Sequence, residues 1–242
     1  MRTEFNAETL LQLWESAIGQ PTATRDSALL QAWSEGVAPP RTLGARNASL
    51  MELHERLFGP EMALLSHCPA CDGVAQFSGD CEELMAQVPV LDATPSHRFE
   101  QQEYVIDFCL PDGADVASSS QSQSDVEFAQ HLLDRCVLAC KRGDANVPVH
   151  ELPMPVLDAL SRHMEALDPG AGVSFALVCP QCGTCWDAQL DVGELVWQKL
   201  RAAAERLLLD VDALARAYGW TEPEVLRLSP VRRAAYLQMV IA

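Results

Sequence analysis

The sequence predicts an α+β protein that is mostly α-helical and carries a small β-hairpin module. Apolar residues three and four positions apart run through both ends of the chain, which is the pattern of amphipathic helices. Two Cys-Pro-x-Cys turns, at residues 68–71 and 179–182, lie beside short segments of strand character. We therefore expect a helical body joined to a zinc-ribbon-like module, built from two knuckles that are far apart in the sequence.

The composition is that of a globular protein with a strongly acidic surface. Hydrophobic residues make up 48% of the 242 residues and charged residues 21%, which is the usual balance for soluble domains. The formal net charge is −17, although residues 198–242 hold seven basic and five acidic residues. An acidic surface repels nucleic acid phosphates and anionic membranes. We therefore expect neither a nucleic acid nor a membrane as a partner.

Cysteine usage and the lack of apolar runs indicate the compartment. Nine cysteines, several of them in Cys-x-x-Cys pairs, suit metal binding better than a secreted disulfide framework. Residues 1–6 lack the apolar core of a secretion signal, and no run approaches the roughly 20 apolar residues of a membrane span. We expect a protein of a reducing, bacterial cytoplasm.

Residues 1–60 are expected to form helices. Asn6 can cap the first of them. A second helix is predicted at Ser27–Glu35 and a third at Ala45–Phe58, where Gly59-Pro60 provides a stop signal.

Residues 61–191 are expected to form the hairpin module, with helices inserted at about 124–167. Alternating apolar residues predict a strand at Gln101–Leu110. A helix is predicted to run to about Lys141 and to place Cys136 and Cys140 on one apolar face. Their four-residue spacing could bind a metal, but apolar neighbours favour buried thiols. Further elements are expected at Val74–Phe77, Pro153–Leu167, Val173–Val178 and Trp186–Leu190.

The two Cys-Pro-x-Cys turns can together hold one metal ion. A turn of this kind directs two thiolates to the same side, and structural zinc takes four ligands in a tetrahedron. We predict Cys68, Cys71, Cys179 and Cys182 as ligands of one structural zinc per chain. More than a hundred residues separate the knuckles, against about 15–20 in common ribbons, so the intervening segment must be an insertion. The alternative is two separate pairs, either buried or redox-active.

Two residues next to the predicted ligands, Cys185 and His67, are alternative candidates for the metal site. Cys185 lies three residues after Cys182 and could replace it or support it, although Gly183 favours Cys182 because it permits the tight turn. His67 precedes Cys68 and is a weaker candidate ligand. Four thiolates favour zinc over magnesium, calcium or manganese, with iron as the remaining alternative.

Residues 192–242 are expected to contain one long helix followed by a terminal helix pair. The long helix should span Gly193–Tyr218, and its apolar residues repeat at three and four positions as in a helix seam. We expect this seam to pack on the N-terminal helices or to bind another protein. The candidate contact residues are Trp197, Leu200, Leu207, Val211, Leu214 and Tyr218, with Ala204 between them.

The chain contains none of the common catalytic motifs. It has no P-loop, no GxGxxG, no GxSxG and no HExxH. A zinc ion with four cysteine ligands has no open position for water, so it would be structural. We expect no enzymatic activity. A DNA-reading role for the terminal helix pair is disfavoured by the acidic charge.

Several motifs spread over residues 45–240 resemble those of the T4-type phage baseplate protein family. They are Leu57-Phe58-Gly59-Pro60 ahead of Cys68-Pro69-Ala70-Cys71, Tyr104–Leu110 before Pro111, Leu132-Leu133-Asp134-Arg135-Cys136-Val137, Cys179-Pro180-Gln181-Cys182-Gly183 with Trp186, Ala213-Leu214-Ala215-Arg216-Ala217-Tyr218-Gly219-Trp220, and Leu228-Ser229-Pro230 followed by Arg232-Arg233 and Tyr236-Leu237. The Ser-rich segment at 118–124 and the additional Cys185 depart from the family pattern.

The resemblance implies a non-enzymatic role in building the baseplate of a contractile phage tail or bacterial contractile injection system. Such a protein would act as a hub assembly chaperone that binds a hub or wedge subunit. Alternatively, it would stay in the particle as a structural baseplate subunit, and it could form an oligomer. Two further alternatives come from the cysteines, namely a Cys-Pro-x-Cys thiol oxidoreductase and a zinc-ribbon nucleic-acid binder.

Overall fold

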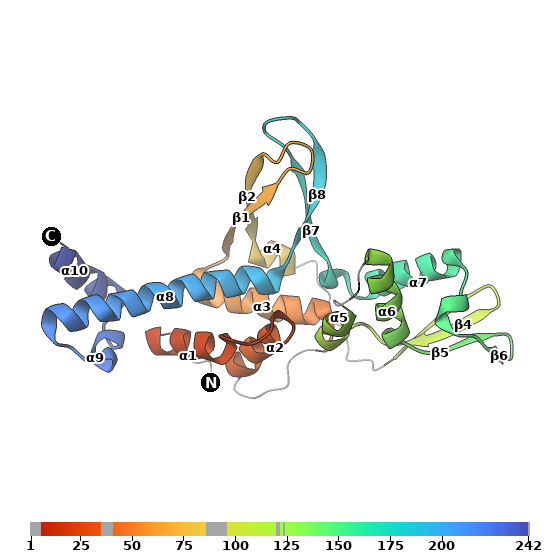
Figure 1. The fold of residues 1–242 in the computed structure, drawn as a ribbon, viewed down its shortest axis with the longest axis horizontal. Coiled ribbons are helices and arrows are strands. Elements are labelled where there is room, and N and C mark those ends of the chain that lie inside the picture. The colour runs from red at the N-terminus through yellow and green to blue at the C-terminus, as the bar shows by residue number, and fades with distance from the viewer. Residues whose placement is uncertain (1–5, 35–40, 86–95, 120–121, 123, 242) are drawn as a thin grey trace.

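The structure is a computed structural model that describes residues 6–34, 41–85, 96–119, 122 and 124–241. It confirms a mixed α+β fold that is mostly helical. A bundle of helices forms an elongated body, two β-hairpins stand on it side by side, and a small sheet with its own helices lies at one end (Figure 1). No helix in the described part of the chain is long and apolar enough to cross a membrane.

Four helices form the body and enclose its main core. Their apolar faces meet around a buried cluster that includes Leu30, Leu50 and Leu200. The long helix α8 contacts both α1 and α3. The four helices are α1 (Ala7–Ala17), α2 (Thr22–Trp33), α3 (Leu43–Phe58) and α8 (Val192–Tyr218).

The seam of α8 faces the same chain over most of its length. Trp197 and Leu200 belong to the main core, and Leu207 packs against α1 through Leu11. Leu214 is fully buried as well, whereas Tyr218 is 41% exposed. Of the six predicted partner contacts, only Val211 and Tyr218 are therefore accessible to another protein in this state.

Two antiparallel hairpins form separate two-stranded sheets. One consists of β1 (Glu61–His67) and β2 (Val74–Asp80), and it continues into the short helix α4 (Cys81–Met85). The other consists of β7 (Val173–Val178) and β8 (Cys185–Leu190). Their inner faces share a small core that includes Met62, Phe77 and Phe175.

The packing of α3 on α8 places these hairpins together. β1 begins three residues after α3 ends, and α8 begins two residues after β8 ends. The two helices are in contact, so the hairpins leave the body from neighbouring points (Figure 1). Helix packing thus brings together two hairpins that are about a hundred residues apart in sequence.

The helix predicted to run to about Lys141 is shorter in the structure, where α6 spans Asp125–Cys136. The helix expected to reach Lys141 ends at Cys136, because Val137 turns to an extended conformation (φ −79°, ψ 115°) and pairs with Phe108 of the neighbouring strand. Cys140 lies on that following strand rather than on a helix. Both cysteines are buried, as expected, with exposures of 0% and 6%.

The strand predicted at Gln101–Leu110 is also shorter than expected. A hairpin turn with Gln102 at φ 57° divides the region into two strands. The resulting antiparallel sheet has the order β3-β4-β5-β6 and packs on α6 and α7 around Ile106 and Leu160. Its elements are β3 (His97–Gln101), β4 (Tyr104–Phe108), α5 (Gly113–Ser119), α6 (Asp125–Cys136), β5 (Val137–Arg142), β6 (Ala145–Asn146) and α7 (Met154–Leu167).

Two short helices close the chain at the far end of α8. Gly219 ends α8 in the left-handed conformation (φ 70°), and Thr221 and Glu224 form a capping box for α9 (Glu222–Leu226). The last helix is α10 (Pro230–Ile241). Trp220 stacks on Tyr218 and meets the Tyr236 ring edge-on, which ties α10 to α8.

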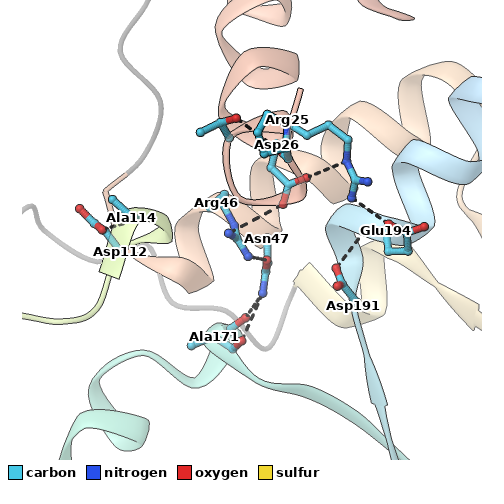
Figure 2. A network of polar contacts seen from close by, with 12 residues as sticks. Arg25, Asp26, Arg46, Asn47, Asp112, Ala114, Ala171, Asp191 and Glu194 are labelled. Carbon is cyan, nitrogen blue, oxygen red and sulfur yellow. Dashed lines mark hydrogen bonds and ion pairs between the residues drawn. The ribbon is translucent and has the colours of Figure 1, made fainter. Parts of the chain in front are cut away.

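A buried polar network locks α2, α3 and the start of α8 together (Figure 2). Arg25 forms an ion pair of 2.9 Å with Glu194, and it lies 3.7 Å from Asp26. Arg46 of α3 lies 3.8 Å from the same Asp26 carboxylate. Burial raises the pKa of Asp26, an effect that Arg46 and Arg25 oppose. Burial outweighs the two arginines in this balance, and the arginines limit the rise of the pKa.

Two glycines make room for buried carboxylates at helix starts. Each occupies the second position of its helix, Gly44 in α3 and Gly193 in α8. Gly44 donates its N–H to Asp168 at 2.9 Å. A Cβ on Gly193 would lie 2.2 Å from the Asp26 carboxylate. Carboxylates are favourable at helix N-termini, where backbone N–H groups are free.

Candidate metal centre

The first knuckle is a tight turn that joins β1 to β2. The Cys68 N–H donates to the Gly73 carbonyl at 2.9 Å, and the Asp72 N–H donates to the Cys68 carbonyl at 2.9 Å. Asp72 adopts a positive φ of 58°. These bonds fold residues 68–73 so that both cysteines belong to one concave turn.

The second knuckle repeats this geometry between β7 and β8. The Cys179 N–H donates to the Thr184 carbonyl at 2.9 Å, and the Gly183 N–H donates to the Cys179 carbonyl at 3.0 Å. Gly183 has a positive φ of 74° and is equivalent to Asp72 of the first knuckle. Glycine has no Cβ to oppose this conformation, as the sequence pattern indicated for Gly183.

The two knuckles meet tip to tip and bring four sulfur atoms together. The Sγ atoms of Cys68 and Cys182 lie 3.6 Å apart, as do those of Cys71 and Cys179. All four lie within 4.8 Å of one another. A tetrahedral zinc with Zn–S bonds of about 2.3 Å requires S···S edges of about 3.8 Å. The cluster therefore has the size of a four-thiolate metal site, and it could hold one metal ion.

These sulfur atoms do not form disulfides. All nine cysteines are free in the structure, and the shortest separations in the cluster exceed the roughly 2.05 Å of an S–S bond by a wide margin. The close pairs also join one knuckle to the other instead of joining the two cysteines of one turn. The predicted alternative of two separate cysteine pairs does not fit this arrangement.

The Gln181 side chain of the second knuckle lies against Gly73 of the first. A Cβ on Gly73 would lie 2.8 Å from the side-chain amide of Gln181. A larger residue at position 73 would therefore require the Gln181 side chain to move aside. Cys68 and Cys179 are buried at this junction, whereas Cys71 and Cys182 are exposed. The cluster is thus half-covered and can be reached from solvent.

Hydrogen bonds to sulfur favour the charged form of two thiols. The side chain and backbone of Thr184 lower the pKa of Cys182 to about 6. Backbone N–H groups of Cys182 and Gln181 lower the pKa of Cys179. Thiolates rather than thiols are the species that ligate metals. N–H···S bonds of this kind also offset the negative charge that four thiolates would bring to one ion.

Cys185 and His67, which the sequence analysis considered as alternative ligands, lie outside the cluster. Cys185 is exposed at the start of β8, and its Sγ lies 4.0 Å from the Gly183 carbonyl. His67 is exposed on β1 and lies 3.3 Å from Asp72. Neither belongs to the group of four ligand atoms. The cluster therefore consists of Cys68, Cys71, Cys179 and Cys182.

His54, Cys81 and Lys199 form a second polar cluster beneath the hairpins, which the sequence analysis did not predict. His54 of α3 is fully buried, with its Nδ1 3.4 Å from the Cys81 sulfur and its Nε2 2.8 Å from Lys199 of α8. Burial and the Lys199 charge lower the pKa of His54 to about 4, and burial raises the pKa of Cys81 to about 11. A neutral imidazole can thus accept from Lys199 and join α3, α4 and α8.

Comparisons of the chain with protein-family models, with curated proteins and with solved structures found no significant match. The resemblance to baseplate proteins therefore rests on the motifs quoted above and stays a prediction.

Proposed function

We propose that the four-cysteine cluster holds one structural zinc ion per chain. The observation that carries this proposal is the near-tetrahedral spacing of four sulfur atoms from two knuckles of equal geometry. Four thiolates complete the coordination of zinc and leave no position for a substrate or water. Iron accepts the same ligand set, but a ferric site of this kind would colour the protein.

The zinc would act as a cross-link between hairpins that share little else. The strands of the two hairpins are not hydrogen-bonded to one another, and only a small apolar core lies between them. Two-stranded hairpins are marginal on their own in water. A bound ion would therefore supply much of the stability of this part of the molecule.

We propose further that the chain is a non-enzymatic assembly factor for the baseplate hub of a contractile phage tail or injection system. In this role it binds a hub or wedge subunit as a chaperone. The family resemblance motivates the proposal, and the charge of −17 supports it, because an acidic body can hold a basic subunit and keep it soluble. The accessible Val211 and Tyr218 remain candidate contacts.

Quantitative mass spectrometry of finished particles beside the soluble lysate tests this role. A chaperone should co-purify with one hub or wedge protein from the lysate and be absent from particles. Presence in particles at a fixed copy number would make the chain a structural baseplate subunit instead. Association with neither fraction would contradict both versions of the proposal.

The structure offers less support to a thiol oxidoreductase or a nucleic-acid binder than to a structural metal site. A thiol oxidoreductase of the thioredoxin type has its Cys-x-x-Cys in a βαβ context, whereas both turns here join the strands of a hairpin. Rapid reaction with a thiol dye before zinc chelation would favour the redox role. Salt-dependent binding to DNA would favour a nucleic-acid role, which the net charge of −17 opposes.

A further inference from the structure

An open groove lies where α1, α8, α9 and the start of α10 meet. Its volume is about 1110 Å³, which exceeds the roughly 300–1,000 Å³ of typical small-molecule sites. Apolar side chains form its floor, among them Leu10 and Leu11 of α1, Leu207 of α8 and Leu226 of α9. The zinc site and the hairpins do not contribute to it. The groove has the size and the apolar floor that a short helix from another protein would need.

The α1 side of this groove is acidic. Glu8 and Glu15 both line it and are exposed. They are seven residues apart, which puts them on one face of α1, about 10 Å from each other along the helix. Neither forms an ion pair within the described residues. These two carboxylates are therefore free to meet positive charge on an occupant.

The α8 and α9 side of the groove is basic. Arg206 of α8 and Arg227 of α9 line it and are exposed, and neither forms an ion pair in the described part of the chain. Two other carboxylates line this side. Asp210 is paired with Arg233 at 3.3 Å, whereas Glu222 is exposed in the first turn of α9 and offsets part of the positive charge. The two exposed arginines still leave this side with a net positive charge.

Arg233 of α10 also lines the groove and carries an unsatisfied donor. Its Nε is paired with Asp210, but its Nη1 is buried and has no hydrogen-bond acceptor among the described residues. The Arg233 side chain is only 14% exposed, so a ligand in the groove does not reach this enclosed donor. Arg233 therefore contributes to the groove through its ion pair with Asp210, which leaves little net charge.

We infer that this groove binds an amphipathic helix of a partner protein. The apolar stripe of that helix lies on Leu10, Leu226 and Leu228, which line the groove and are half-buried, because Leu11 and Leu207 are only 5% exposed. Acidic residues flank the stripe on the side of the arginines, and basic residues flank it on the side of Glu8 and Glu15. Opposite charges on the two flanks fix the direction in which the helix enters. The inference concerns this surface alone and does not depend on the proposed baseplate role.

The test uses two synthetic helical peptides of about 15 residues, or roughly four turns. Both have the same leucine stripe and the same composition. One carries glutamates on one flank and lysines on the other, and its counterpart has the flanks exchanged. Fluorescence anisotropy with the full chain at low salt should show that the matching peptide binds about tenfold more tightly, since two or more exposed charge pairs change sign.

Charge reversal in the chain provides the matched comparison. The double variant Glu8→Lys, Glu15→Lys should weaken binding of the matching peptide about tenfold. The control is Asp158→Lys with Glu165→Lys, which makes the same charge change at the same seven-residue spacing on exposed positions of α7. It should bind the peptide as the unaltered chain does. Circular dichroism checks that both variants stay folded.

Four outcomes would overturn the inference. The first is that neither peptide binds, and the second is that both bind equally well. The third is binding that appears only after residues 1–5 are removed, which would assign the groove to the chain's own N-terminal segment. Equal loss of binding in the α1 and α7 variants would show only a general charge effect and would also contradict it.

Discussion

The substitution Cys179→Ser should release the proposed zinc ion and unfold both hairpins while the helical body stays folded. Serine is a poor zinc ligand, so three thiolates would remain in a site built for four. The free energy of zinc binding is also folding free energy for small metal-stabilised modules, on the order of 10–16 kcal/mol at neutral pH. Zinc content should fall from one equivalent to background, and amide protection should disappear in β1, β2, β7 and β8.

The helical body gives this experiment an internal reference. Its main core lies on α1, α2, α3 and α8 and does not include the knuckles, so the far-ultraviolet signal of helix should change little. Hydrogen exchange followed by mass spectrometry separates the two regions. Cys185→Ser is the matched control, because Cys185 lies in the same hairpin but outside the cluster. A Cys179→Ser chain that keeps a full equivalent of zinc would remove Cys179 from the ligand set.

The substitution Gly193→Ala should destabilise the helical body by about 2 kcal/mol, as overpacking of a tight interior does. The new Cβ would lie 2.2 Å from one oxygen of Asp26, and this carboxylate is only 7% exposed and lies between Arg25 and Arg46. Alanine at an open helix position would instead stabilise by up to about 1 kcal/mol relative to glycine. Urea denaturation measures the difference.

A double-mutant cycle shows whether Asp26 is the cause. In an Asp26→Ala background the carboxylate is gone, so Gly193→Ala should become neutral or slightly stabilising. The coupling between the two positions should then be about 2 kcal/mol or more, which is in the range for residues in direct contact. Equal effects of Gly193→Ala in both backgrounds would mean that the Asp26 carboxylate does not limit this position.

The four-cysteine cluster could be predicted from the sequence because its information is local. Each Cys-Pro-x-Cys turn shows its own geometry in six residues, and strands flank both turns. The pairing of the two knuckles followed from the coordination number of zinc and not from their spacing. The choice between Cys182 and Cys185 also depended on a local feature, the glycine at 183, whose φ of 74° the structure confirms.

The strand β5 could not be predicted in the same way. The apolar residues before and after Cys136 continue the three- and four-residue spacing of a helix. They form a strand because Val137 and Cys140 pair with Phe108 and Ile106 of β4. A pairing partner about thirty residues away is not visible in a local pattern, and tertiary contacts override weak helix propensity.

The buried polar groups were missed for a related reason. Asp26 and Gly193 look like ordinary surface and helix-start residues in the sequence, and their contact joins positions far apart in the chain. His54 similarly depends on Lys199, which lies 145 residues later. Only the packing of α3 on α8 brings these partners together. That same packing sets the positions of the two hairpins and so of the cysteine cluster.

The most direct test of a four-thiolate zinc site is X-ray absorption spectroscopy at the zinc edge of the purified chain. The account predicts one zinc per chain with a single shell of four sulfur atoms at about 2.3 Å. A shell that contains nitrogen or oxygen ligands would place His67 or water at the metal and contradict the closed cysteine site. A chain that is purified without any tightly bound metal would contradict the proposal that an ion joins the two hairpins.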